Sequence, residues 1–271
     1  MSLAGTAVIL ARGLGSRMRR ADEAAALDPR QQVAATAGLK AMIPDTAGRP
    51  FLDHILSSLA DAGVKRVVLV VAPDAAIIRD HLTNHPPRRL TVEWAVQQEP
   101  RGTADAVLAA EPLVGDRPFL VLNADNLYPV AAIRALVSLG EPGLVAFDRE
   151  ALVREGNIDP DRVAAFALLE MDSHGYLLRL VEKPDAPAAR ALDDTWVSMN
   201  LWRFDAAIFD ACRRVPPSVR GELELPQAVM HGLHDGLRLR AIPMHAGVLD
   251  LSRRGDIAKV AVRLGRERPN P

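Results

Sequence analysis

The chain has 271 residues, of which 49% are hydrophobic and 25% are charged, with 33 lysines and arginines against 34 aspartates and glutamates. This composition is typical of a protein that folds around a hydrophobic core, and it excludes intrinsic disorder as the main state. A net charge of -1 does not favour nucleic acid or an anionic membrane as partner. The longest apolar runs, such as residues 67–72, are far shorter than the roughly 20 residues that span a bilayer. We therefore expect a cytoplasmic protein.

Strand-like and helix-like segments alternate along the first part of the chain. Periodicity predicts amphipathic helices, and short β-branched runs predict strands. Such alternation is typical of a mostly parallel sheet that is covered by helices. The predicted strands are residues 6–11, 66–72, 90–96, 119–124 and 144–147. The predicted helices are residues 28–38, 50–62, 74–82, 103–111, 129–139, 205–213, 226–234 and 254–264.

A different pattern follows residue 150. Residues 163–170 and 177–181 are separated by the turn 172–175, which predicts an antiparallel hairpin. The sheet is therefore expected to be mixed. Because no long linker rich in Gly, Ser or Pro interrupts the chain, we expect a single domain over residues 1–271.

The first strand leads into a glycine loop, residues 10–18, with the sequence LARGLGSRM. Gly13 and Gly15 let the backbone approach a phosphate closely, and successive N–H groups together with Arg17 can bind the anion. A bare turn between a strand and a helix is the alternative reading of the glycines. The dinucleotide fingerprint G-x-G-x-x-G also begins in this way, but its third glycine position is Met18 here. The loop therefore favours a phosphate chain as ligand over a nicotinamide or flavin dinucleotide.

Further short motifs follow the glycine loop in a fixed order. They are GLK at residues 38–40, GRPFL at 48–52, Gln97, RGTADAV at 101–107, Asn-Ala-Asp at 123–125, VEKP at 181–184, SMNLW at 198–202 and VLD at 248–250. Each is modest alone, but the ordered series resembles the sugar-1-phosphate nucleotidylyltransferases, also called nucleoside-diphosphate-sugar pyrophosphorylases. The resemblance covers nearly the whole chain.

The resemblance implies both a fold and a reaction. The fold is an α/β, Rossmann-like nucleotidyltransferase fold: a mixed, mostly parallel central sheet flanked by helices, with a β-hairpin in the later half. Residues 1–130 would form the nucleotide-binding half and residues 131–271 the half that binds sugar phosphate. The reaction is Mg²⁺-dependent transfer of a nucleotidyl group from a nucleoside triphosphate to a sugar-1-phosphate, which releases pyrophosphate.

Two aspartates are the expected ligands of Mg²⁺. Asp125 follows a predicted strand, where open α/β sheets bind ligands beyond the carboxyl ends of their strands. Mg²⁺ prefers one or two carboxylates together with phosphate oxygens and water. Asp250 is the second ligand that the family pattern implies, since sequence spacing alone does not show that the two carboxylates meet. Either aspartate taken singly would more often be a turn or cap residue.

The nucleotide is expected to contact the glycine loop and two later segments. Arg17 and Lys40 would bind the triphosphate and, with Asp125, form the catalytic set, although a lysine beside a helix end is commonly just solvated. Gln97 could hydrogen-bond the base edge, with Gln98 as the second choice. The expected nucleotide-binding residues are Leu10, Ala11, Gly13, Gly15, Ser16, Gln97, Gly102 and Thr103, where Gly102 admits a flat base and Thr103 caps the following helix.

The sugar side is expected in the later half. By resemblance, Lys183 lies near the sugar phosphate, and Glu182 and Asn200 bind hydroxyl groups. A charge pair of little energetic value is the alternative for Glu182 and Lys183. Glu222 and Glu224 resemble the family's acidic segment, or act only as favourable charges near a helix N-terminus.

Several other residues have both a structural and a functional interpretation. His231 and His234 lie three residues apart on a predicted helix, but a solvated surface is the stronger reading than a metal pair. Cys212 is read as a buried structural thiol. Arg12 stands where the family has a small residue, so it adds a phosphate contact or obstructs one. Residues 19–39 are expected to form an added helix or a flap.

Other functions remain open at this point. One is a nucleotidyltransferase that acts on a cofactor or polyol phosphate, and another is a sensor that binds nucleotide sugars without catalysis. Residues 101–107 resemble the adenylyl-transferring glucose-1-phosphate enzymes, which gives a weak preference for ATP. The sequence leaves open which sugar is used and whether the chain forms a homo-oligomer.

Overall fold

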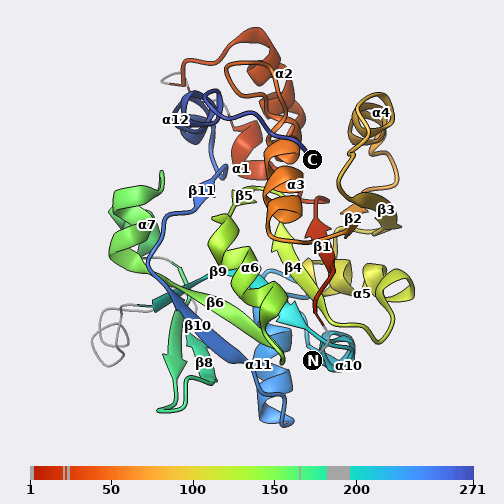
Figure 1. Cartoon of the computed structure of the whole chain (residues 1–271), viewed down its shortest axis with the longest axis vertical. Coiled ribbons are helices and arrows are strands. Elements are labelled where there is room, and N and C mark those ends of the chain that lie inside the picture. Colours follow the sequence, from red (N-terminus) through yellow and green to blue (C-terminus); the bar gives the residue numbers. More distant parts are fainter. Residues whose placement is uncertain (1–2, 21, 23–24, 165, 182–195) are drawn as a thin grey trace.

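The computed structural model describes residues 3–20, 22, 25–164, 166–181 and 196–271 (Figure 1). Among them, nine strands form one mixed sheet, and two short strands form a separate ribbon. The strands of the main sheet are β1 (Thr6–Leu10), β2 (Arg66–Val71), β3 (Thr91–Val96), β4 (Phe119–Asn123), β6 (Gly143–Asp148), β7 (Leu168–Met171), β8 (Leu177–Val181), β9 (Trp196–Phe204) and β10 (Arg240–Met244). The ribbon pairs β5 (Asn126–Leu127) with β11 (Leu249–Asp250).

The helices pack on both faces of the main sheet. They are α1 (Ser16–Arg19), α2 (Pro29–Ala37), α3 (Phe51–Asp61), α4 (Ala76–Asn84), α5 (Thr103–Val114), α6 (Val130–Ser138), α7 (Arg149–Glu155), α8 (Pro160–Val163), α10 (Ala207–Arg214), α11 (Leu225–His234) and α12 (Arg254–Leu264), with the 3₁₀ turn η1 (Lys40–Met42). One apolar cluster joins one face of the sheet to α3, α6 and α12. A second cluster joins the other face to α5, α10 and α11.

The sheet order is β10-β6-β9-β4-β1-β2-β3, and β9 is the antiparallel strand within it. Strand β1 lies between β2 and β4 in parallel register, so that Val8 is level with Val68 and Val121. Parallel strands end at the same edge of a sheet, and this edge carries the residues that follow β1, β3 and β4. Sequence segments that are about a hundred residues apart therefore converge there.

The mixed α/β architecture of the prediction is confirmed, and the expected strands and long helices are present within a few residues. The expected start of the hairpin is wrong: α8 ends at Val163 and β7 begins only at Leu168. Strand β9 was not predicted as a strand. It is buried on both faces and carries Ser198 and Arg203 inside the sheet, so that it shows no simple alternation.

The segment between the glycine loop and Lys40 contains the expected helix. Asp28 caps α2 by accepting from the N–H groups of Arg30 and Gln31, and Gly38 ends the helix with a φ of 74°. Arg254 is buried and donates to the carbonyl of Met18, the side chain of Gln32 and the hydroxyl of Thr36. Helix α2 is thereby tied to α12. None of the described helices combines the length and apolar character that a membrane crossing requires.

Candidate functional site

A cavity of about 360 Å³ opens at the carboxyl edge of the sheet. Its wall includes residues 10–17 and 38–41, the end of β4 at 123–125, and side chains from the β3–α5 connection. All the expected triphosphate and base residues line it, namely Leu10, Ala11, Gly13, Gly15, Ser16, Arg17, Lys40, Gln97, Gly102, Thr103 and Asp125. The fold thus brings together motifs that the sequence could place only in order.

The two glycines of the loop have different structural roles. Gly15 has a φ of 60°, and a Cβ on it would lie 2.4 Å from the carbonyl oxygen of Gly38. The turn and its packing on the end of α2 therefore account for Gly15, as the alternative reading of the loop holds. A Cβ on Gly13 would meet nothing within 4 Å. No contact within the described chain accounts for Gly13, and the space beside it is open to the cavity.

Lys40 and Asp125 form an ion pair inside the cavity, with 2.7 Å between Nζ and Oδ2. The left-handed turn at Gly38 ends α2 and directs the chain into η1, which begins at Lys40. Both side chains stay partly exposed, at 22% and 25%. An ammonium group at this distance can move to a phosphate oxygen, because lysine is a mobile point charge.

Gln97 directly follows β3, is buried, and its side chain forms hydrogen bonds within the protein. Its amide nitrogen donates to the carbonyl of Gly102 at 2.9 Å and to Asp105 at 2.8 Å. The amide oxygen is the group that remains for a base edge. Gln98 contributes its carbonyl, which accepts from Arg12 at 2.9 Å. Arg12 also donates to the carbonyl of Gln97, so that it braces the base side of the cavity.

Gly102 and Thr103 differ from the expectation in their local roles. A Cβ on Gly102 would lie 2.3 Å from the carbonyl oxygen of Leu223, so the close approach that requires glycine is made by the protein's own backbone. The expectation that Thr103 caps α5 is wrong, since the N-cap is Gly102 and no side chain caps that helix. The Thr103 hydroxyl instead accepts from the N–H of Leu225, at the start of α11. Thr103 therefore joins two helices beside the cavity.

Asp250 lies next to Asp125 through backbone pairing. In the β5–β11 ribbon Asp250 is opposite Asn126, and the N–H of Leu251 donates to the carbonyl of Asp125 at 2.9 Å. The Asp250 side chain is only 5% exposed, and its Oδ2 accepts from Arg162 at 3.0 Å. Burial, and then the negative charge of Asp125, raise the pKa of Asp250 to about 6.

The remaining oxygen of this carboxylate has no partner. Oδ1 of Asp250 is buried and accepts no hydrogen bond within the described chain. A buried carboxylate oxygen without a partner is costly, and a bound cation removes that cost. The described residues contain no cluster of three or more Asp, Glu, His or Cys side chains that could hold a metal. Two carboxylates are nevertheless enough for Mg²⁺ when phosphate and water complete its shell.

Three residues that sequence reasoning did not assign lie around the site. Tyr128 follows β5, is buried and donates to the carbonyl of Met199 at 2.6 Å. Burial, and then the charges of Asp125 and Asp250, raise the pKa of Tyr128 well above its usual value. Arg220 lines the cavity, next to Glu222, and pairs with Glu224. Arg162 holds Asp250. Only its position beside the acidic segment of Glu222 and Glu224 could have indicated Arg220 from the sequence. No local sequence signal indicates Tyr128 or Arg162.

The expected sugar-side residues are placed only in part. Glu182 and Lys183 lie outside the described residues. Asn200 is on β9 and has a φ of 58°, and its carbonyl accepts from Tyr128 at 3.4 Å. It does not line the cavity that Asp125 lines. Glu222 does line it, whereas Glu224 is the buried N-cap residue of α11.

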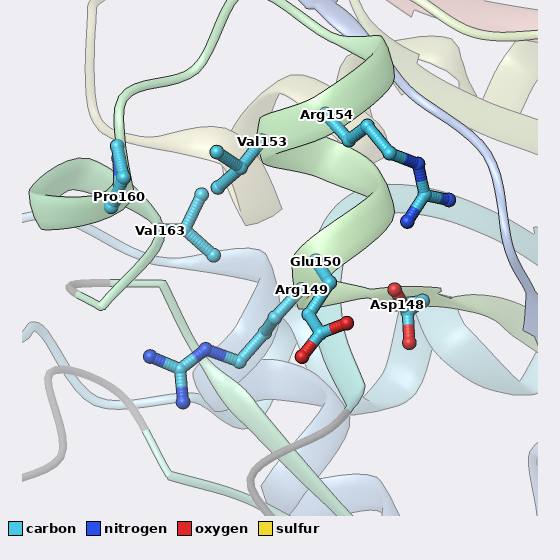
Figure 2. A pocket seen from close by; sticks show the side chains of 7 residues that line it. All are labelled: Asp148, Arg149, Glu150, Val153, Arg154, Pro160 and Val163. Carbon is cyan, nitrogen blue, oxygen red and sulfur yellow. The ribbon is translucent and has the colours of Figure 1, made fainter.

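A second cavity, of about 550 Å³, lies beside α7 and α8 (Figure 2). In Figure 2, Val153 and Val163 point toward each other from these two helices, and the charged side chains lie below them and to one side. Asp148, Arg149, Glu150, Arg154 and Pro160 complete the described lining. Its charges are mixed in sign, and it contains none of the expected site residues.

The remaining chemical candidates have structural roles or lie at the surface. Cys212 is buried, and burial raises the pKa of its thiol to about 12, which makes it inert at neutral pH. His234 is 89% exposed and lies 3.4 Å from the carboxylate of Asp235. His231 is also exposed. The reading of a solvated helix surface therefore fits both histidines.

Known proteins are similar to this chain along nearly its whole length. A UTP–glucose-1-phosphate uridylyltransferase, AglF, of Haloferax volcanii is 28% identical over 96% of this chain and 97% of that protein. A glucose-1-phosphate thymidylyltransferase of Streptomyces antibioticus is 28% identical, over 94% of this chain and 64% of that protein. A solved structure of UDP-glucose pyrophosphorylase with UDP-glucose covers 99% of this chain and 100% of that chain, with 16% identity and a TM-score of 0.74.

The structural likeness confirms the predicted Rossmann-like nucleotidyltransferase fold. The two chains share this fold although only 16% of their residues are identical. The family model described as nucleotidyl transferase matches residues 35–250, which include Lys40, Asp125 and Asp250. This chain belongs to the nucleotidyl transferase family.

Proposed function

We propose that this protein transfers a nucleotidyl group from a nucleoside triphosphate to a sugar-1-phosphate and releases pyrophosphate. The observation that carries the proposal is the single cavity in which the glycine loop, Lys40 and Asp125 meet. Asp250 does not line this cavity, but its strand pairs with the residue that follows Asp125. The names of the relatives support a sugar-1-phosphate as acceptor. We further propose that residues 1–271 work as one domain.

The reaction is an in-line displacement at the α-phosphorus. An oxygen of the sugar-1-phosphate forms the new bond, and the bond to the bridging oxygen of pyrophosphate breaks. Because the second pKa of a phosphate monoester is about 6, the nucleophile is already anionic at neutral pH and requires no general base. The protein must instead offset the repulsion between two anions and stabilise the leaving group.

The chain's own residues provide this stabilisation. Arg17, Lys40 and the N–H groups of residues 11–16 would bind the triphosphate, while Gln97 and Gly102 flank the base. Asp125 and the unpartnered Oδ1 of Asp250 fit a hard divalent cation, so these carboxylates would hold Mg²⁺. Bound there, Mg²⁺ would neutralise charge on the α-phosphate. We assign the sugar and its phosphate to Glu182, Lys183 and Asn200.

A substrate matrix tests the proposal. Pyrophosphate release is measured with Mg²⁺ for five nucleoside triphosphates, each combined with a panel of sugar-1-phosphates. Turnover that needs both a triphosphate and a sugar-1-phosphate is the expected result. Turnover only with a cofactor or polyol phosphate would move the enzyme to another class of nucleotidyltransferase. Tight binding of nucleotide sugars without turnover for any pair would indicate a sensor.

A further inference from the structure

The connection between α7 and α8 holds the backbone of Asp250. The side-chain amide of Asn157 donates to the Asp250 carbonyl at 2.8 Å, and its oxygen accepts from the Asp250 N–H at 2.7 Å. Asn126 of β5 is opposite Asp250 in the ribbon. Both backbone polar groups of Asp250 are therefore bound by Asn157, and the strand is fixed in place.

Arg162 holds the side chain of the same aspartate. Its Nη2 donates to Oδ2 of Asp250 at 3.0 Å, and its Nη1 donates to Oδ1 of Asp256 at 2.6 Å. The three side chains are 8%, 5% and 8% exposed for Arg162, Asp250 and Asp256. The planar guanidinium spans two carboxylates at once, which a lysine ammonium cannot do with the same geometry. Since Oδ2 is occupied by Arg162, Oδ1 is the oxygen left without a partner.

The charges in this cluster leave it suited to a cation. Arg162 carries one positive charge, and Asp250 and Asp256 carry two negative charges when both are ionised. Asp256 is also fixed by the N–H groups of Ser252 and Arg253 at the start of α12. Asp256 therefore offsets the positive charge of Arg162, which alone would repel a metal ion. One negative charge remains, and the free oxygen through which it can act is Oδ1 of Asp250.

We propose that Arg162 is a positioning residue that directs Oδ1 of Asp250 toward a divalent cation shared with Asp125. The inference rests on the proposed function, because that function supplies the cation site. Arg162 acts by engaging Oδ2, which leaves Oδ1 as the oxygen available to the cation. Loss of a hydrogen-bonding partner behind a metal ligand typically weakens metal binding by about 10- to 100-fold.

Mn²⁺ binding to the nucleotide-free protein tests the proposal. We measure its affinity by electron paramagnetic resonance for wild type, Arg162→Met and Arg162→Lys. Arg162→Met is expected to weaken Mn²⁺ binding by about 10-fold or more, and Arg162→Lys by less, because the charge is retained without the fork. The matched control is Arg203→Met, since Arg203 is also buried but binds the carbonyls of Leu136 and Val137. That variant should lower the melting temperature and leave Mn²⁺ affinity unchanged.

The outcomes separate this inference from the proposed function. Wild-type Mn²⁺ affinity in Arg162→Met overturns the role of Arg162 while the metal site stands. If Arg162→Met does not fold, wild-type affinity in Arg162→Lys overturns it instead. Mn²⁺ binding that survives in both Asp125→Asn and Asp250→Asn, or a wild type that binds no Mn²⁺, overturns the metal site itself.

Discussion

Asp125 and Asp250 are neighbours in space but lie in opposite surroundings. Asp125 follows β4, is 25% exposed and pairs with Lys40, a side chain that can move. Asp250 is on β11, is 5% exposed and is held by Arg162, while Asn157 binds its backbone. The difference suggests a division of work: one carboxylate can exchange partners when substrate enters, and the other is fixed in advance.

Replacing the accessible carboxylate should give the largest effect on turnover. Asp125→Asn removes a proposed ligand charge but keeps the shape of the side chain. We expect pyrophosphate release to fall by about 10³-fold, since a metal ion contributes several kcal/mol to stabilising the transition state. The free energy of unfolding should change by less than about 1 kcal/mol, because the ion pair with Lys40 is partly exposed. Near-normal pyrophosphate release would contradict the role of Asp125.

Removing the mobile partner should separate catalysis from metal binding. Lys40→Ala deletes a charge that the triphosphate needs, and we expect turnover to fall by about 10²-fold. The same change frees Asp125 from its ion pair, so Mn²⁺ affinity without nucleotide should rise a few-fold. Lys259→Ala is the matched control, because Lys259 is 63% exposed and lies 3.5 Å from Asp159. Equal losses of turnover and Mn²⁺ affinity would show that Lys40 acts only on the fold of the site.

The glycine loop offers a second contrast, between a glycine that the fold needs and one that it does not. Gly15→Ala should destabilise the protein by about 2 kcal/mol or more, because it adds a clash with Gly38 to a left-handed φ. Gly63→Ala should cost about 1 kcal/mol, since its φ is 99° but its surroundings are open. Gly13→Ala should leave stability within about 0.5 kcal/mol of wild type and still weaken nucleotide binding. Urea unfolding and nucleotide titration measure the two effects, and unchanged nucleotide affinity in Gly13→Ala would remove its assigned role.

Sequence reasoning succeeded where local signals are strong. The helix predicted over residues 28–38 and the β-branched runs of β1, β2 and β4 each follow from neighbouring residues. Position after a predicted strand indicated Asp125 as a ligand candidate, and the family resemblance was needed to choose that reading over a turn or cap residue. The conformation at each of these places is determined by residues close in sequence, so a local pattern is enough to predict it.

The later half was harder to read because its elements depend on distant partners. Strand β9 is buried on both faces, and a bulge interrupts its pairing with β6, so no simple period is visible. Strand β11 exists only through pairing with β5, more than a hundred residues earlier. Arg162 resembles a surface residue in sequence and is buried because two aspartates meet it. Family resemblance could indicate Asp250, but only the fold shows what holds it.

The buried carboxylate should also make stability depend on pH when metal is removed. The pKa of Asp250 is raised from 3.8 to about 6, first by burial and then by the charge of Asp125. The folded protein therefore binds more protons than the unfolded chain between these values, and stability from this group is full below roughly pH 4 and is lost as the pH rises through about 6. In EDTA, the free energy of unfolding of wild type relative to Asp250→Asn should fall across this range by on the order of 2 kcal/mol. Thermal melting at each pH measures the difference. Saturating Mg²⁺ should abolish the decline, because metal binding requires the ionised carboxylate. A constant difference at every pH in EDTA would mean that burial does not raise the pKa of Asp250.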